Sequence, residues 1–252
     1  MREPLVARLQ EAWQHGLGLL FPRVCAFCEA DLSELTDPAA SLCRDCRQSL
    51  AAPVPQCCLR CGELGPVSVQ GPAGCPTCRK RKLKFSELVF LGMYEESLRS
   101  AILRMKHARE EPLTTAMAEL LWNERQERLW ALEADVLAPI AMHWSRRTVR
   151  GTNSPEILAE LLARRLRAPS AMRLLRRRKR TLPQGGLPRT RRFENLRDAF
   201  AVRGGRDVRG CHVLLVDDVL TTGATCNAAS TALLKAGAAK VTVVALARAA
   251  SL

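Results

Sequence analysis

Residues Val213–Thr225 read VLLVDDVLTTGAT, and this stretch decides the fold predicted for the chain. The four apolar residues Val213–Val216 have the length and composition of a strand that is buried on both faces. Two carboxylates end the strand, and small polar residues then open a helix over Thr225–Ala236, which Gly237 terminates. A further apolar strand follows at Lys240–Ala247. This order predicts an α/β fold, in which helices flank a parallel sheet.

The sequence before this stretch continues the same pattern of apolar strands and amphipathic helices. Asn153 or Ser154 is suited to cap a helix that has Pro155 in its first turn. We expect strands at Ser86–Met93 and Asp135–Ile140, and helices at Leu98–Met105, Leu113–Leu132 and Ser154–Leu166.

The loop between the strand and the helix has the chemistry of a phosphate-binding site. A helix N-terminus offers N–H groups and the positive end of a dipole to a phosphate. The paired carboxylates can accept hydrogen bonds from two ribose hydroxyls and can help to hold Mg²⁺ through water. An ordinary capped turn explains one Thr and one Gly, but not the whole run. The candidate residues are Asp217, Asp218, Thr221, Thr222, Gly223, Ala224 and Thr225.

Nine of the 11 cysteines lie between Cys25 and Cys78, in four Cys-x-x-Cys pairs and one extra residue, Cys57. Two such pairs complete a tetrahedral site of four thiolates, so we expect two structural zinc sites, with an iron–sulfur cluster or disulfides as the weaker readings. The spacing to Cys61 favours Cys58 over Cys57, and Gly62 suits a turn with positive φ. The expected ligands are Cys25, Cys28, Cys43 and Cys46 for one site, and Cys58, Cys61, Cys75 and Cys78 for the other.

The remaining two cysteines, Cys211 and Cys226, are interpreted as buried small hydrophobic residues near the phosphate loop. A site filled by four cysteines has no open position, so both metal sites are assigned to stability or partner contact and not to catalysis.

The net charge of +14 favours a polyanionic partner, although basic residues spread over a solvated surface would give the same total. Twelve Arg and Lys residues and no acidic residue lie between Arg164 and Arg192. Such a strip suits a phosphodiester backbone, while the alternative is a mobile loop that binds only pyrophosphate. The nucleic-acid candidates are Arg176, Arg177, Arg178, Lys179 and Arg180.

No stretch approaches 18 consecutive apolar residues, and the N-terminus lacks the pattern of a signal peptide, so we expect a cytoplasmic protein without a membrane span and with reduced cysteines. The predicted divisions are residues 1–24 with an amphipathic helix at Leu5–Leu20, residues 25–81 as a double zinc ribbon, and residues 82–252 as the α/β domain.

Several segments together resemble the ComF family of competence-associated proteins, which have a zinc ribbon and a type I phosphoribosyltransferase-like domain. The segments are LLFPRVCAFC at Leu19–Cys28, MYEESLRSAILRMKH at Met93–His107, RGTNSPEILAELLA at Arg150–Ala163, TLPQGGLPRTRRFENLRDAF at Thr181–Phe200 and the Val213–Thr225 loop. The resemblance covers almost the whole chain.

The resemblance implies that Asp217 and Asp218 face the ribose of phosphoribosyl pyrophosphate and that the following loop binds its 5′-phosphate. It also implies that Arg150 lies near the pyrophosphate, and that Gln184, Arg192 and Asn195 belong to the segment that folds over the site.

The chain departs from family patterns at two places. The family usually has Arg-Gly-Phe-Asn-Gln where this chain has Arg150–Ser154, so one aromatic is missing. Purine-salvage phosphoribosyltransferases have an acidic general base where this chain has Thr221. The resemblance therefore argues against purine salvage and leaves the catalytic residue unknown.

Three functional hypotheses follow. The first is a protein of DNA uptake that binds phosphorylated ribose and single-stranded DNA, with a competence helicase or other DNA-processing proteins as partners. The second is an active Mg²⁺-dependent phosphoribosyltransferase with an unknown acceptor. The third is a zinc-ribbon adaptor whose α/β domain is only a scaffold.

Overall fold

The computed structural model describes residues 22–65, 74–107, 109–141, 153–178, 188–204 and 207–250. The chain divides into two compact units, Met1–Gln48 and Ser49–Leu252, and each is described by itself. The helix predicted at Leu5–Leu20 lies outside the described residues.

The described part of the first unit is a short cysteine-containing segment. Its first turn is closed by a hydrogen bond of 2.8 Å from the N–H of Cys25 to the carbonyl of Ala30. Val24 and Asp31 form an isolated antiparallel bridge across this turn. Helix α2 (Arg44–Leu50) begins in the first unit and ends in the second.

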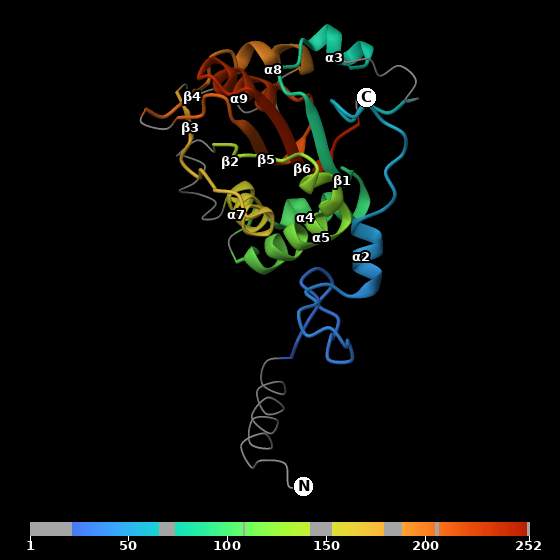
Figure 1. Cartoon of the computed structure of the whole chain (residues 1–252). Coiled ribbons are helices and arrows are strands. Elements are labelled where there is room, and N and C mark those ends of the chain that lie inside the picture. The colour runs from blue at the N-terminus through green and yellow to red at the C-terminus, as the bar shows by residue number, and fades with distance from the viewer. Residues whose placement is uncertain are drawn as a thin grey trace. The chain divides into compact units, whose positions relative to one another are not determined.

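A four-stranded parallel sheet forms the centre of the second unit (Figure 1). Its strands lie in the order β1 (Glu87–Met93), β6 (Lys240–Arg248), β5 (His212–Leu220) and β2 (Val136–Pro139). Nearly every residue of β1 and β6 is buried, as expected for strands covered on both faces. The α/β fold predicted from the apolar runs is confirmed.

Helices cover both faces of this sheet. Helices α4 (Glu96–Arg104), α5 (Glu111–Trp130) and α7 (Ser154–Leu166) lie on one face in Figure 1, and α9 (Ala224–Lys235) lies on the other. Each buries an apolar stripe, as Leu158 and Leu162 do in α7. Helix α7 begins at the predicted residue.

The outer edge of β1 is satisfied by groups outside the sheet. The N–H of Leu88 donates to the carbonyl of Leu59 at 2.9 Å, and the guanidinium of Arg125 donates to the carbonyls of Phe90 and Leu91 at 2.9 Å each. An edge strand with unpaired backbone groups would invite pairing with another chain. The hydrogen bond from Leu88 to Leu59 also connects the sheet to the segment that carries the second set of cysteines.

A small antiparallel ribbon accompanies the sheet. It pairs β3 (Leu175–Arg177) with β4 (Phe200–Val202), and the short helix α8 (Arg189–Asn195) between them packs against α9. The sequence did not predict this ribbon. It places Arg176 and Arg177 of the basic segment on a strand, whereas the alternative hypothesis expected a mobile loop there.

The second four cysteines belong to the same compact unit as the sheet. Cys58, Cys61 and Cys78 are buried in one hydrophobic cluster with residues of β1, β5 and β6, and Cys78 lies on α3 (Pro76–Arg81). The region predicted as one double ribbon over residues 25–81 is thus divided between the two units. The boundaries after residues 24 and 81 stay predictions. Within the described part of the chain, we find no helix that is both long enough and apolar enough to cross a membrane.

Candidate functional site

The predicted phosphate loop lies at the carboxyl edge of the parallel sheet. Strand β5 runs two residues further than predicted, because Leu220 is still paired with Arg248 of β6. On the other side of β5, the N–H of Ile140 donates to the carbonyl of Val216 at 2.8 Å. The loop and the residue that follows β2 therefore lie at the same edge, where open parallel sheets bind ligands.

The loop turns sharply into α9 at Gly223. This residue has φ +79°, the left-handed region that favours glycine, and serves as the N-cap of the helix. Thr222 is buried, and its hydroxyl accepts a hydrogen bond of 3.3 Å from the N–H of Ala224. Thr221 and Thr225 are partly exposed. The loop can therefore offer two hydroxyls and the N–H groups of the first helical turn to an anion.

The two adjacent carboxylates have different surroundings. Asp217 is buried, and burial together with the nearby carboxylate of Asp218 raises the pKa of Asp217 well above its ordinary value. Asp218 is only partly buried, and its Oδ2 lies 3.9 Å from Nζ of Lys106. The carboxyl of Asp217 thus keeps its proton to a higher pH than an ordinary aspartate does, while the carboxylate of Asp218 lies beside a lysine ammonium.

The thiol of Cys226 lies in the first turn of α9 and donates to Oδ2 of Asp217 at 3.5 Å. Burial raises the pKa of Cys226, so the thiol keeps its proton. Cys226 is buried, as the sequence predicted, whereas Cys211 is only partly buried.

Three basic residues around the loop were not predicted. Lys106 approaches Asp218, Nη1 of Arg81 donates to the carbonyl of Thr222 at 3.3 Å, and Nη1 of Arg248 donates to the carbonyl of Thr221 at 2.9 Å. Arg248 has no exposed surface. A basic residue at the end of an otherwise apolar strand was the only signal in the sequence that could have identified it.

Two of the predicted covering residues, Arg192 and Asn195, lie on α8 and are partly buried. A groove of about 430 Å³ separates part of α8 from α9, and Phe193, Asn227 and Ala224 are among its lining residues. Arg150, Gln184, Lys179 and Arg180 lie outside the described residues.

The ribbon exposes two of the predicted nucleic-acid residues, Arg176 and Arg178. The guanidinium of Arg177 lies over the ring of Phe200, 5.7 Å from its centroid. Because successive side chains point to opposite faces of the ribbon, Arg176 and Arg178 lie in solvent while Arg177 stacks on Phe200.

Asn153 precedes α7 and is buried, and neither atom of its side-chain amide has a hydrogen-bond partner among the residues that the structure describes. Such a group in a native protein needs an explanation, for example a ligand or an ordered water. The next residue, Ser154, donates to the carbonyl of Met105 at 3.2 Å, so this end of α7 adjoins the segment that carries Lys106.

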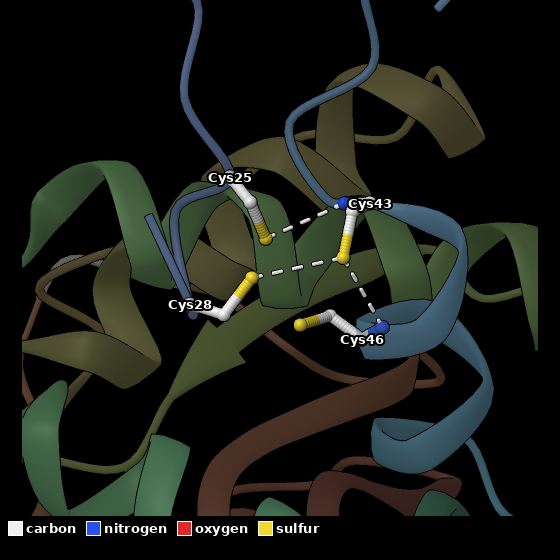
Figure 2. Close-up of side chains that lie close together, drawn as sticks. All are labelled: Cys25, Cys28, Cys43 and Cys46. Carbon is white, nitrogen blue, oxygen red and sulfur yellow. Dashed lines mark hydrogen bonds between the residues drawn. The ribbon is translucent and has the colours of Figure 1, made fainter. Parts of the chain in front are cut away.

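The first four cysteines form one compact group (Figure 2), with the Sγ atoms of Cys28 and Cys43 3.7 Å apart. All four sulfurs lie within 4.8 Å of one another. Zinc bonds to sulfur of about 2.3 Å place the corners of a tetrahedron about 3.8 Å apart, so this group can hold a zinc ion. Burial acts to raise the pKa of Cys25, but N–H donors of Cys28 and Cys43 lower it to about 6.

The second group has the same geometry. The sulfur of Cys58 lies 3.7 Å from that of Cys78, and the sulfur of Cys61 lies 3.5 Å from that of Cys75. Cys58 belongs to the group of four, and Cys57 does not. Gly62 has φ +66°, as its turn after Cys61 requires.

Comparison with known proteins places the chain in a class. Residues 156–252 match the family model of the phosphoribosyl transferase domain. The match begins in α7 and includes β3–β6, so it contains the complete phosphate loop. The fold and the loop together define a protein with a domain of the phosphoribosyltransferase type.

Full-length relatives narrow this class. Competence protein F of Haemophilus influenzae is 30% identical over 231 residues, which cover 89% of this chain and 96% of that protein. DNA utilization protein YhgH of Escherichia coli is 28% identical over a match that covers 91% of this chain and 99% of that protein. Competence protein ComFC of Bacillus subtilis is 26% identical over a match that covers 86% of this chain and 90% of that protein. The chain belongs to the ComF family.

One solved structure that is similar to this chain is a glutamine phosphoribosylpyrophosphate amidotransferase of Bacillus subtilis. It is 22% identical, covers 52% of this chain and 26% of its own, and has a TM-score of 0.32. That likeness is too low to support a conclusion about the site.

We predict that Asp217→Asn stabilises the ligand-free protein. The raised pKa of Asp217 means that the folded chain binds this proton more tightly than the unfolded chain, so wild type loses stability as pH rises above 3.8. The neutral amide avoids this loss. Urea unfolding should show a gain on the order of 1 kcal/mol at pH 8 and a smaller gain at pH 5.

The control for this measurement is Asp207→Asn. Asp207 is exposed, and its hydrogen bonds with Arg209 lower its pKa to about 2, so its replacement should give no gain at either pH. A stability of Asp217→Asn equal to or below that of wild type at pH 8 would contradict the prediction.

A second prediction concerns the adjacent cysteines. Cys58→Ser should lower the zinc content of the purified chain from two equivalents to one, whereas Cys57→Ser should leave two. Elemental analysis after gel filtration measures both contents. Loss of zinc in Cys57→Ser, or two equivalents in Cys58→Ser, would show that the wrong thiol has been assigned.

Proposed function

We propose that the loop at the end of β5 binds phosphoribosyl pyrophosphate with Mg²⁺, and that the chain acts in the handling of single-stranded DNA during uptake. The observation that carries the ligand is the pair of carboxylates at the carboxyl edge of the sheet, directly before a turn into a helix N-terminus. Each part suits one part of the ligand.

The 5′-phosphate would lie at the first turn of α9, where it can accept hydrogen bonds from N–H groups and from the hydroxyls of Thr221 and Thr225. Asp217 and Asp218 would accept from the ribose hydroxyls. Mg²⁺ would be held mainly by the ligand's phosphates and by water, which is how proteins usually bind it. Lys106, beside Asp218, and the unsatisfied amide of Asn153 would lie on the pyrophosphate side.

The predicted covering residues have the chemistry that this ligand needs. Arg150, Gln184, Arg192 and Asn195 would close over the pyrophosphate, with the guanidiniums binding its oxygens in pairs. We propose zinc as the metal of both four-cysteine groups, since thiolate ligands at tetrahedral spacing suit it.

The DNA role is supported by the relatives and by charge. Relatives bear the names competence protein F and DNA utilization protein, and the net charge of this chain is +14. The exposed Arg176 of β3 and Arg178, which directly follows β3, would bind the phosphodiester backbone together with Lys179 and Arg180. Partners would be DNA-processing proteins such as a competence helicase, in the cytoplasm, where the thiols remain reduced.

A second candidate function is phosphoribosyl transfer to an unidentified acceptor. The complete loop favours it, since Asp217–Thr225 carries every group expected for the donor substrate. Thr221 cannot act as a general base, so the acceptor would need to be nucleophilic without losing a proton to this position. Release of pyrophosphate that depends on an added acceptor would establish this activity, and its absence with all nucleobases would leave binding alone.

Binding is tested by calorimetry. Phosphoribosyl pyrophosphate with Mg²⁺ should bind wild type, while a buffer without Mg²⁺ (but without a chelator, so that zinc stays bound) should remove most of the heat. Asp218→Asn should raise Kd about tenfold or more, because hydrogen bonds to a charged group are lost. The control Asp207→Asn should bind as wild type does. An absence of heat with wild type would refute the assignment of the loop.

DNA binding is tested by its dependence on salt. For single-stranded DNA, the slope of log K against log salt is negative. The double variant Arg176→Gln, Arg178→Gln should reduce its magnitude by about 1.4, because each lost phosphate contact removes about 0.7. The control Lys80→Gln, Arg99→Gln removes two exposed cations from α3 and α4 and should keep the slope. Equal slopes for both double variants would exclude the ribbon as the DNA-binding surface.

A further inference from the structure

We propose that the second four-cysteine group is a structural part of the phosphate site, and that Arg248 and Arg81 are the positioning residues that join them. Metal bound at Cys58, Cys61, Cys75 and Cys78 would then fix the geometry of the phosphate loop. The inference rests on the proposed function of that loop and assigns to the metal a task other than contact with DNA or with a partner.

The side chain of Arg248 connects the two sites directly. Its Nε donates to the carbonyl of Cys61 at 2.6 Å, and its Nη1 donates to the carbonyls of Thr221 at 2.9 Å and Leu220 at 3.4 Å. Its Nη2 forms an ion pair of 3.1 Å with the carboxylate of Glu63. One guanidinium therefore binds the backbone of Cys61, which belongs to the four-cysteine group, and the backbone of Leu220 and Thr221, which lead into the loop.

The turn of the cysteine segment is pressed against the stem of the same side chain. A Cβ added to Gly62 would lie 2.8 Å from Cγ of Arg248 and 3.1 Å from Cδ2 of Leu88. Neither neighbour is free to withdraw, because both are fully buried. A displacement of this turn on metal loss would therefore displace Arg248.

Arg81 makes a second connection, from the end of helix α3, which carries the last cysteine. It lies three residues after Cys78, and its Nη1 donates to the carbonyl of Thr222 at 3.3 Å. Further along, the N–H of Lys84 donates to the side-chain oxygen of Asn227 in α9 at 2.7 Å. The same segment also packs on the turn into α9, since a Cβ added to Gly223 would lie 3.7 Å from the side chain of Phe85 and 3.8 Å from that of Leu83.

The two halves of the cysteine group are also tied to each other beside the loop. Arg60, between the first two cysteines of the group, donates to the carbonyls of Phe85 at 2.8 Å and Leu83 at 2.6 Å. Metal ligation at Cys58 and Cys61 and at Cys75 and Cys78 thus orders both segments that reach the loop.

These contacts set the direction in which the loop presents its N–H groups. The carbonyls of Leu220, Thr221 and Thr222 all accept hydrogen bonds from the two guanidiniums. In a planar trans peptide the following N–H points opposite to the carbonyl. The N–H groups that follow these three carbonyls, the last of them that of Gly223, therefore point away from the guanidiniums, toward the side on which the phosphate would bind.

The experiment measures hydrogen exchange of the loop in the ligand-free, zinc-loaded chain, together with calorimetric binding of phosphoribosyl pyrophosphate with Mg²⁺. Arg81→Ala should speed exchange at residues 221–225 and raise Kd about tenfold, while both zinc ions remain bound. Arg81→Lys keeps the charge and should recover part of the loss. Lys80→Ala, an exposed neighbour on α3, is the matched control and should change neither quantity.

The metal itself is tested by a pair of cysteine variants. Cys78→Ser removes a ligand of the second group and should speed loop exchange and weaken binding, whereas Cys28→Ser removes a zinc ion from the first unit and should leave both as in wild type. If Cys78→Ser unfolds the second unit, Arg81→Ala decides the matter. The inference is overturned if Arg81→Ala matches Lys80→Ala in exchange and in Kd. Absence of binding by wild type would instead refute the proposed function, and the exchange data would still test the connection.

Discussion

The buried guanidinium of Arg248 joins the end of β6 to the end of β5 and to the turn after Cys61. A charge without exposed surface is tolerated only when its donors are paired, because an unpaired buried charge costs several kcal/mol. Its partners are backbone carbonyls from two distant segments and the carboxylate of Glu63. The end of β6, the end of β5 and the turn after Cys61 must therefore meet at one place. Burial of this residue makes that meeting a condition of folding.

The same guanidinium fixes the backbone at the start of the phosphate loop. The strand that leads into this loop also contains an energetically unfavourable group, the buried carboxyl of Asp217. Asp217 is buried with its neighbour Asp218 nearby, an arrangement that disfavours the ionised carboxylate. The backbone N–H of Asp218 and the thiol of Cys226 each donate a hydrogen bond to this carboxyl, which only partly offsets the burial. Ribose hydroxyls would supply further donors. Sites that bind ligands often retain such unfavourable groups, which a change for stability alone would remove.

The sequence predicted the sheet well, because its strands are continuous apolar runs. Strands β1, β2 and β6 and helix α9 begin and end within a residue or two of their expected limits. Strand β5 extends past its apolar run, since its pairing with β6 continues through residues whose side chains are polar. The ribbon of β3 and β4 was missed because three-residue strands are too short for a period to be recognised, and Arg177 and Phe200 stabilise it by stacking across the ribbon.

The candidate site was predictable only where its residues are adjacent in sequence. Asp217–Thr225 forms one motif, whereas Lys106 and Arg248 reach it through the fold, and Arg248 is 187 residues from its partner Cys61. Similarly, the spacing of the cysteines identified two groups of four but could not separate their roles. That distinction depends on what each group packs against, which no local pattern records.

The two cysteine groups are alike in ligands and in sulfur spacing, yet they differ in what surrounds them. Three thiols of the second group lie in the hydrophobic core that also contains residues of β1, β5 and β6, and the neighbouring thiol of Cys78, together with burial, raises the pKa of Cys61. Without metal, the second group would lose the bonds that hold two short segments together. A site with four protein ligands offers no position for catalysis. The hydrogen bonds of Arg248 and Arg81 connect this group to the phosphate loop, and they are the basis of our proposal that metal at this group would fix the geometry of the loop.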